Sequence, residues 1–337
     1  MNSRRLVVIV TSILGVWAIA FCLSQSEATD PGNNGVFVQK SVVRLNDFLD
    51  VEDTPNSKVY FLGASTSNGI WVAGTNSHAL VFDLKTNRLL RKLPSQMAHG
   101  VLTATGLVAL ANNDELWVFD GKSGERKAYL KGTGEAPLCV AFADENRRLF
   151  YGLHTGSIGK WEAKSGAHRV LAEGHKGAVW DIAELPLTGE IVSVGEDGLL
   201  KFWEVSSGKL VSTLGEGAPI WGVTVSGDKK VFATSTKEGI ISWRDAQTRK
   251  KLGHLRAHHG RILAIAFVGN RYLISASTDR TVRLWDLKMN KEVARIKKRI
   301  IWVQHICVVP ASNLVFLDAI GDIEVWELNL PNKKGNR

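Results

Sequence analysis

The chain has 337 residues, with 42 Lys and Arg against 33 Asp and Glu and only three cysteines. This composition agrees with one globular domain, and the formal charge of +9, or +8 without residues 1–28, favours acidic or phosphate-bearing partners. We expect no disulfide, because Cys22 lies in an N-terminal apolar run and Cys139 and Cys307 are buried small hydrophobes in distant parts of the chain.

The N-terminus has the pattern of a segment that directs export. Residues 1–5 form a basic cap, residues 6–23 are apolar, and residues 24–28 end on the small side chain of Ala28. This pattern is typical of a signal peptide cleaved after Ala28, and an uncleaved membrane anchor is the alternative. Either version places the rest of the chain outside the cytoplasm, so we expect a periplasmic, cell-envelope or secreted protein.

Residues 29–57 are expected to be a linker that contains one strand. The stretch 36–45 reads Val-Phe-Val-Gln-Lys-Ser-Val-Val-Arg-Leu, which is rich in β-branched and aromatic residues. It precedes the first copy of a repeat and belongs to none of the copies.

From residue 58 onward the chain repeats itself about every forty residues. The clearest mark is an aromatic residue, mostly followed by an acid, whose copies are Phe82, Phe119, Trp161, Trp203, Trp243, Trp285 and Trp326. Self-similarity at this period predicts a repeat architecture. The copies fall at roughly residues 58–93, 94–131, 132–172, 173–215, 216–255, 256–296 and 297–330, with a polar tail at 331–337.

Each complete copy holds four short apolar runs. Residues 175–214 contain four such runs separated by Gly, Pro, Ser and Asp turns, and residues 258–296 repeat the plan. Runs of this length bounded by turn residues indicate strands, and no ten-residue stretch after the leader has a convincing helical period. The domain is therefore predicted to be all-β.

Two copies carry motifs that resemble a known family. The motifs are Gly174-His175, Glu196-Asp197-Gly198 and Trp203-Glu204 in one copy, and His258, Thr278-Asp279-Arg280 and Trp285-Asp286 in the other. They resemble the histidine, turn aspartate and terminal tryptophan of WD40 repeats. The resemblance implies a seven-bladed β-propeller of four-stranded antiparallel blades around a central channel.

The last repeat is one strand short. After Leu330 only the polar tail 331–337 remains, and it is too polar and too broken by proline to form a fourth strand. We therefore predict that the strand at 36–45 completes the seventh blade and closes the ring.

Apparent catalytic triads in blades 4 and 6 are interpreted as structural. The two sets are His175, Ser193, Asp197 and Trp203, and His258, Ser275, Asp279 and Trp285. In both, the serine lies ten residues and the aspartate six residues before the tryptophan, and an active site would occur once rather than recur with the repeat. The resemblance implies buried hydrogen-bond networks that end on the indole N–H.

The other blades keep only parts of this set. Asn76 and Asn113 stand at the aspartate position of the first two blades, and Thr155, Lys237 and Ile320 stand there in blades 3, 5 and 7. We therefore expect blades 4 and 6 to be the most rigid and the first two blades to be held mainly by packing.

A second set of aromatic residues keeps the same period on another strand. Trp180, Trp221 and Trp302 each fall near the start of an innermost strand, where Leu138 and Leu263 stand in blades 3 and 6. The resemblance places this position at the rim of the channel, on the face that usually binds peptides and proteins. Exposed tryptophans there would form an apolar anchor site. The alternative is that they plug the channel and contact only each other.

Basic residues in two loops extend this predicted surface. They are Arg256 and Arg261 near the sixth inner strand, and Lys297, Lys298 and Arg299 before the seventh. A basic arc beside an aromatic rim suits an acidic peptide, a phosphate-bearing envelope polymer or an anionic membrane surface. A solvated face that only aids solubility is the alternative. Nucleic acid is disfavoured by the export signal, a membrane contact requires an uncleaved leader, and we expect a monomer.

The sequence has no motif for another kind of site. It lacks a Walker loop, a dinucleotide fingerprint, a haem-attachment motif, a His-Glu-x-x-His zinc motif and a calcium loop. His254, His258 and His259 have no carboxylate or cysteine spaced to complete a metal site, so we predict neither metal nor cofactor. We predict a non-catalytic exported scaffold that binds a protein or peptide. The alternative is an enzyme or cofactor-binding protein of the cell envelope.

Overall fold

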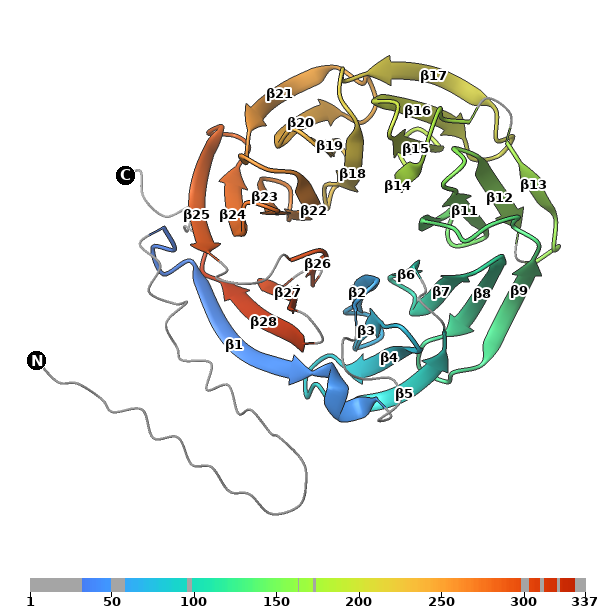
Figure 1. Ribbon diagram of the computed structural model, residues 1–337, viewed down its shortest axis with the longest axis horizontal. Coiled ribbons are helices and arrows are strands. Elements are labelled where there is room, and N and C mark those ends of the chain that lie inside the picture. The colour runs from blue at the N-terminus through green and yellow to red at the C-terminus, as the bar shows by residue number, and fades with distance from the viewer. Residues whose placement is uncertain are drawn as a thin grey trace, which may run out of the picture.

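The protein forms a ring of small sheets around a central channel (Figure 1). The computed structural model describes residues 32–49, 58–95, 99–162, 164–171, 174–297, 303–309, 312–319 and 322–330. These residues form seven four-stranded antiparallel sheets and one short 3-10 helix, Leu45–Phe48. The prediction of an all-β, seven-bladed propeller is thus confirmed. The predicted leader at 1–28 and the polar tail at 331–337 lie outside the described residues.

In blades 1 to 6 the strands run outward from the channel in chain order. The inner strands of blades 1 to 7 are β2 (Phe61–Ser65), β6 (His99–Leu102), β10 (Cys139–Ala143), β14 (Val179–Leu185), β18 (Ile220–Val225), β22 (Ile262–Val268) and β26 (Ile306–Val308). The second strands are β3 (Ile70–Gly74), β7 (Leu107–Asn112), β11 (Arg148–Gly152), β15 (Glu190–Gly195), β19 (Val231–Thr236), β23 (Tyr272–Ser277) and β27 (Leu314–Ala319).

The outer half of each blade follows the same order. The third strands are β4 (His78–Asp83), β8 (Glu115–Asp120), β12 (Ile158–Glu162), β16 (Leu199–Glu204), β20 (Ile240–Asp245), β24 (Thr281–Asp286) and β28 (Asp322–Leu328). The outer strands are β5 (Leu89–Pro94), β9 (Arg126–Lys131), β13 (His168–Val170), β17 (Leu210–Gly215), β21 (Lys251–Arg256), β25 (Lys291–Lys297) and β1 (Phe37–Arg44).

The recurring aromatic residues lie in the core between blades. The second strands are buried along nearly their whole length, as in β15, whereas an outer strand such as β17 alternates between half-buried and exposed residues. Trp203 of β16 is fully buried and packs in a cluster that contains Phe150 of blade 3 and Val179 of its own blade. The period of about forty residues therefore records the spacing of contacts between neighbouring blades.

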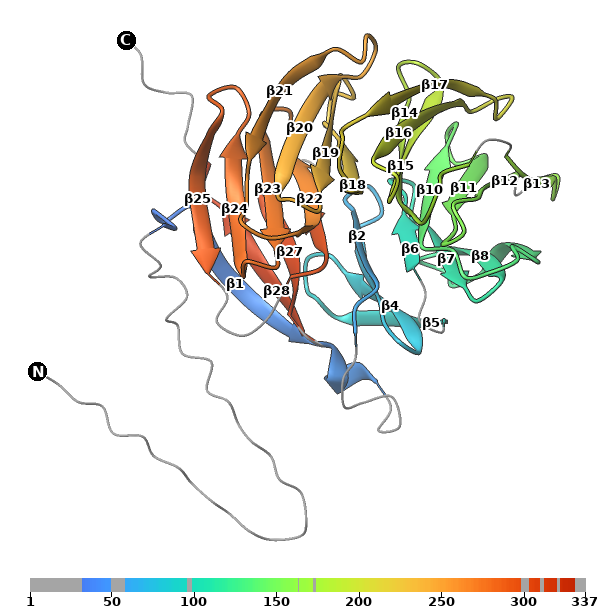
Figure 2. The same ribbon diagram turned by 45° about the horizontal axis from the view of Figure 1, so that its top comes forward.

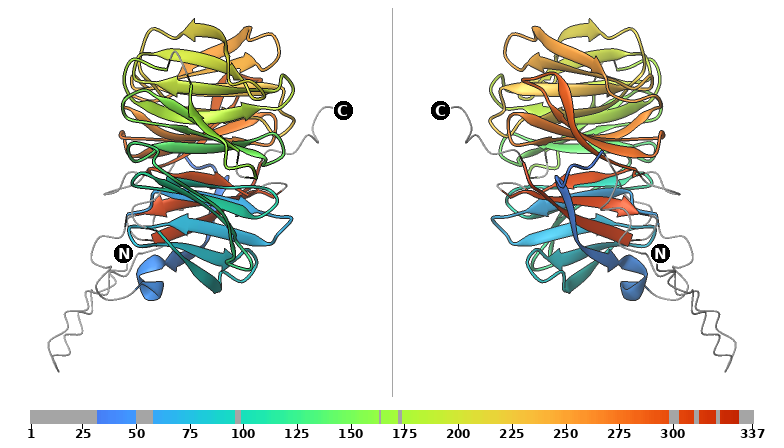
Figure 3. Two further views of the ribbon diagram at one scale, coloured as in Figure 1. Left: turned by 90° about the vertical axis from the view of Figure 1, so that its right-hand side faces the viewer. Right: turned by 90° about the vertical axis from the view of Figure 1, so that its left-hand side faces the viewer.

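The N-terminal strand closes the ring, as predicted. β1 pairs antiparallel with β28, from Phe37 opposite Leu328 to Arg44 opposite Asp322 (Figure 2). Phe37 is buried, and its ring meets Trp326 edge-on with ring centroids 6.3 Å apart. In the side view, β1 (blue) lies along the outside of the red strands of blade 7 (Figure 3). The seventh blade thus joins the two ends of the domain.

Chain direction defines two faces of the ring. Each inner strand begins at one face and ends at the other, so the residues just before and at the start of the seven inner strands gather at one face, which we call the rim face. The turns that join the second to the third strands lie at the same face. Among the residues that the structure describes, no helix is long and apolar enough to cross a bilayer.

Candidate binding site at the channel mouth

A β-bulge marks the start of three consecutive inner strands. The pairing of inner and second strand shifts between Val179 and Asp181 in blade 4, and it shifts at the equivalent place in blades 5 and 6. The residues that the shifts leave unpaired are Trp180, Trp221 and Leu263. A bulge bends the strand and re-aims one side chain. The same backbone device therefore presents these three residues in neighbouring blades.

The tryptophans of blades 4 and 5 stack on each other. The ring centroids of Trp180 and Trp221 are 4.2 Å apart, and the planes differ by 12°. The guanidinium carbon of Arg261, from blade 6, lies 4.2 Å from the centroid of the Trp221 ring. Both tryptophans are half-buried. Three blades thus contribute one layer each to an aromatic and cationic stack at the rim.

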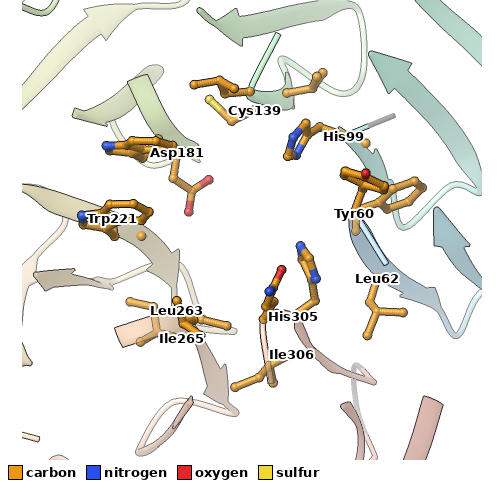
Figure 4. Close-up of a pocket in the computed structure, with 18 residues that line it drawn as sticks. Tyr60, Leu62, His99, Cys139, Asp181, Trp221, Leu263, Ile265, His305 and Ile306 are labelled. Carbon is orange, nitrogen blue, oxygen red and sulfur yellow. The ribbon is translucent and has the colours of Figure 1, made fainter. Parts of the chain in front are cut away.

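The stack borders a cavity of about 550 Å³ at the mouth of the channel. Every blade contributes to its wall, with Tyr60, His99, Leu138, Cys139, Asp181 and Leu263 among the lining residues (Figure 4). Leu138, the predicted rim residue of blade 3, lines the cavity without a bulge, because β10 pairs in register from Cys139 onward. The cavity is therefore continuous around the ring but differs in chemistry from blade to blade.

The predicted basic residues are only partly described. Arg261 lies in the stack, Arg256 is exposed at the end of β21, and Lys297 is exposed at the end of β25. Lys298, Arg299 and Trp302 lie outside the described residues. The inner strand of blade 7 begins at Ile306, four residues after the predicted tryptophan.

Asp181 places a carboxyl group in the channel wall, where the sequence patterns predicted none. Its two oxygens accept the backbone N–H groups of Ile182 and, across the blade boundary, Val223, each at 2.9 Å. Removal from water raises the pKa of Asp181 to about 7, although the two backbone bonds favour the charged form. The group therefore titrates near neutral pH and joins blade 4 to blade 5.

Two histidines lie across the channel mouth from this acid. The side chain of His99, like that of Asp181, projects from the wall toward the middle of the opening (Figure 4). Burial, and secondarily the nearby His305, lower the pKa of His99 to about 4. His305 Nδ1 lies 3.2 Å from Asp318 Oδ2, and Asp318 Oδ1 accepts the backbone N–H groups of Gln304 and His305. The channel thus holds the neutral imidazole of His99 and the imidazole of His305, which Asp318 holds in place.

One sequence signal could have found these polar groups. Asp181 directly follows Trp180, and His99 and His305 also stand close to the start of inner strands. Polar residues near the start of each inner strand would have predicted these groups. The recurring tryptophans at the same position did not.

The structure brings each predicted network together. In blade 4, His175 Nδ1 lies 2.8 Å from Asp197 and its Nε2 lies 2.8 Å from Ser193 Oγ, which accepts the indole N–H of Trp203 at 2.9 Å. In blade 6 the same bonds join His258, Asp279, Ser275 and Trp285 at 2.9, 2.7 and 2.8 Å. Burial lowers the pKa of both histidines, so each imidazole is neutral at pH 7.

Blade 3 lacks this arrangement. Tyr151 occupies the serine position, and its hydroxyl bonds to His168 on the outer strand instead of to the indole. The indole N–H of Trp161 is buried and has no acceptor. Packing alone therefore holds the tryptophan of this blade.

The two cysteines that the structure describes do not form a disulfide. Cys139 and Cys307 are both free and buried, and burial raises the pKa of Cys307 to about 12. In the described part of the chain, no three His, Cys, Asp or Glu side chains gather as they would around a metal ion.

Comparison with family models matches two segments of the chain, residues 168–204 and 249–286, to the family described as "WD domain, G-beta repeat". These segments contain the tryptophan ends of blades 4 and 6. The protein is a seven-bladed propeller in which these two segments match the WD40 repeat.

This propeller is similar to parts of longer proteins. It is 31% identical over 140 residues to human WD repeat-containing protein 36 and 33% identical over 139 residues to U3 small nucleolar RNA-associated protein 21 of Saccharomyces cerevisiae. The matches cover 40% and 41% of the propeller chain but only 16% and 15% of the relatives. A third relative, small ribosomal subunit protein RACK1 of Neurospora crassa, is 35% identical over 113 residues, which are 33% of this chain and 35% of the relative.

These relatives correct the predicted location. Their names refer to nucleolar RNA and to the small ribosomal subunit, which are components of the cell interior, so the prediction of a periplasmic, cell-envelope or secreted protein is wrong. It rested on the apolar run at residues 6–23, and a short apolar run behind a basic cap is a pattern that does not by itself establish export. The argument against a nucleic-acid partner depended on export and falls with it.

Proposed function

We propose that this WD40 propeller is a non-catalytic scaffold that captures an extended acidic or phosphorylated segment of a partner protein across its channel mouth. The stack of Trp180, Trp221 and Arg261 is the observation that carries this proposal. Trp302, Lys298 and Arg299 belong to the proposed surface on sequence grounds alone.

The stack offers apolar area and charge in one place. Half-buried tryptophans held by a bulge and by each other lose little side-chain entropy when a partner covers them, which is a property of binding hot spots. Arg261 adds a cation that the Trp221 ring already fixes in position. An apolar side chain followed by an acid or a phosphate is the ligand that matches this order of groups.

The charge of the channel sets the path of the segment. Asp181 stands beside Trp180 in the channel wall, so an acidic side chain that entered the channel would meet a carboxyl group. Arg256, Arg261 and Lys297 lie on blades 5 and 6, away from that acid. We therefore propose that the segment lies across the tryptophans with its acids directed toward blade 6.

Two further points support a scaffold rather than an enzyme. The Ser–His–Asp groups of blades 4 and 6 are committed to the buried tryptophans Trp203 and Trp285. The relatives are named for association with a small nucleolar RNA and with the small ribosomal subunit. We propose that this propeller likewise acts within an assembly of several components.

The test compares the rim with the opposite face of the ring. Binding of fluorescent acidic and phosphorylated peptides is measured for the wild type and for a Trp180→Ala/Trp221→Ala variant. Loss of one hot spot of about 2 kcal/mol should weaken binding roughly 30-fold. The matched control is Leu187→Ala/Met289→Ala, which removes two exposed apolar side chains from turns at the opposite face.

The thermal midpoint of each variant shows that the ring remains folded. Arg261→Ala should weaken binding of the acidic peptides but not of neutral ones with the same apolar residues. Unchanged affinity of the folded double tryptophan variant, or an equal decrease in the control, would refute the proposal.

A further inference from the structure

The positive charge of the protein is concentrated on its circumference. The seven outer strands together contain 13 Lys and Arg but a single acid, Glu292. The rest of the chain then carries 29 Lys and Arg against 32 Asp and Glu. The inner strands have no Lys or Arg at all, and their two acids are Asp181 and Glu184. The net charge of +9 thus comes entirely from the outer strands.

We call the Lys and Arg residues of the seven outer strands the outer belt. Every one of them is exposed. Several make ion pairs at the surface, such as Lys40 with Glu327 at 3.0 Å and Lys127 with Glu125 at 2.6 Å, but pairs this exposed are weak and exchange readily for another anion. The belt is therefore accessible to a charged partner.

Protection of the sheet edge accounts for only part of this charge. Edge strands carry charged side chains, Lys above all, so that they do not pair with another chain. Six of the 13 basic residues are Arg, to which that preference does not apply. The chain as a whole has 33 acids to place, and it places one of them on an outer strand. The bias points to a ligand with negative charge.

The shape of the belt favours a flexible polymer. A membrane is flat on the scale of this ring, so it would contact only part of a curved circumference, whereas a polymer chain can follow the curve. A polyanion with one charge per unit gains affinity from each Lys or Arg that it meets through release of counterions.

One aromatic residue distinguishes between polyanions. Tyr129 of β9 has 43% of its surface exposed, and its hydroxyl donates to Glu115 at 2.8 Å, which fixes the ring. The guanidinium carbon of Arg126 lies 5.5 Å from the ring centroid. An exposed aromatic ring among basic side chains can stack on a nucleobase. A polyglutamate chain has no ring that could stack on it.

We infer that the outer belt binds the phosphate backbone of single-stranded nucleic acid, with its centre on β5 and β9. The groups that bind the phosphates are Arg91 and Lys92 of blade 1 and Arg126, Lys127 and Lys131 of blade 2, with Tyr129 under one base. Blades 1 and 2 are joined where Arg91 Nε of β5 donates to the carbonyl of Lys122, in the turn before β9, at 2.7 Å. This surface is separate from the rim stack of blades 4 to 6.

The test uses the full chain with fluorescent 30-residue oligouridylate and oligothymidylate. Conversion of the five belt residues on β5 and β9 to Gln should raise Kd at least tenfold. It should also reduce the slope of log K against log salt by about 0.7 for each phosphate that the variant no longer neutralises. The matched control replaces Lys164, Lys176, Lys230, Lys237 and Lys288 with Gln; these five are exposed and lie outside the outer strands. It removes the same charge and should change Kd less than threefold.

A second pair of variants tests the stacking. Tyr129→Ala should weaken binding about fivefold or more while Tyr129→Phe keeps most of it, since the ring and not the hydroxyl meets the base. Any of three results would overturn the inference. The belt variant could bind as tightly as the wild type, or the belt and control variants could lose the same affinity. Alternatively, polyglutamate or anionic vesicles could displace the oligonucleotide as readily as unlabelled oligonucleotide does. Trp180→Ala/Trp221→Ala should bind the oligonucleotides like the wild type, so failure here leaves the proposed function of the rim unaffected.

Discussion

Blades 3 and 4 have the same strand order but hold their tryptophans in different ways. Trp203 of blade 4 ends a chain of hydrogen bonds through Ser193 and His175, whereas Trp161 of blade 3 is equally buried and bonds to nothing. The backbone registers of the two blades nevertheless agree in their second and third strands. The blade is thus specified by packing of the aromatic residue, and the polar network adds stability to a shape that exists without it.

The histidine substitutions should have the largest effect on this contrast. His258→Ala removes one partner of the half-buried Asp279 and one partner of the buried Ser275, so we expect a decrease of about 2–4 kcal/mol in the free energy of unfolding. His168→Ala in blade 3 removes a half-buried ring from an outer strand and should cost about 1 kcal/mol or less. Urea denaturation measures both. Equal decreases would mean that the network contributes no more than an ordinary contact.

Removal of one hydroxyl at the same repeat position should give a smaller difference. Ser193→Ala breaks bonds to His175 and Trp203 and should cost about 1–3 kcal/mol, because two buried groups lose their partner. Tyr151→Phe breaks only the bond to His168 and should cost about 0.5–1.5 kcal/mol. The comparison would fail if the tyrosine variant proved the less stable of the two.

The rigidity of the two networked blades is open to measurement. Amide hydrogen exchange at pH 7 should show blades 4 and 6 as the most protected part of the ring. Uniform protection across all blades would show that the networks do not rigidify their blades beyond packing.

Acidification should produce the smallest effect. The pKa values of His175 and His258 are lowered in the folded state by burial, so the folded chain binds fewer protons than the unfolded chain does. Their contribution to stability is complete above the unfolded pKa of about 6.5 and is lost as the pH falls from there through the folded pKa. Between pH 7 and pH 5, exchange protection should fall in blades 4 and 6 more than in blade 5, where Lys237 stands at the aspartate position.

The sequence predicted the architecture because each blade repeats the same local information. Seven aromatic residues at one period indicated the number of blades, and the missing last strand pointed to the segment at 36–45. A strand such as β1, whose partner lies far away in the sequence, can be placed only when the strands of all the other blades have been assigned.

The site was less predictable because it depends on contacts between blades. The stack of Trp180, Trp221 and Arg261 joins three copies whose mutual rotation is absent from any one of them. The pKa of Asp181 depends likewise on the backbone of the next blade, through the N–H of Val223. The outer belt depends likewise on which strand of each blade carries each Lys and Arg.

Closure by β1 has a consequence for the order in which the protein can mature. Phe37 of β1 pairs with Leu328 of β28. β1 is therefore synthesised early, but nearly the whole chain must leave the ribosome before its partner strand is available. At about 5–20 residues per second this takes roughly 15–60 seconds, during which six blades can form in sequence but the ring stays open. In that interval the edges of β1, and the apolar face of the first blade that later packs against blade 7, are open to other chains. The lysine at the middle of β1, Lys40, provides charge on one of those edges while the partner is still being synthesised.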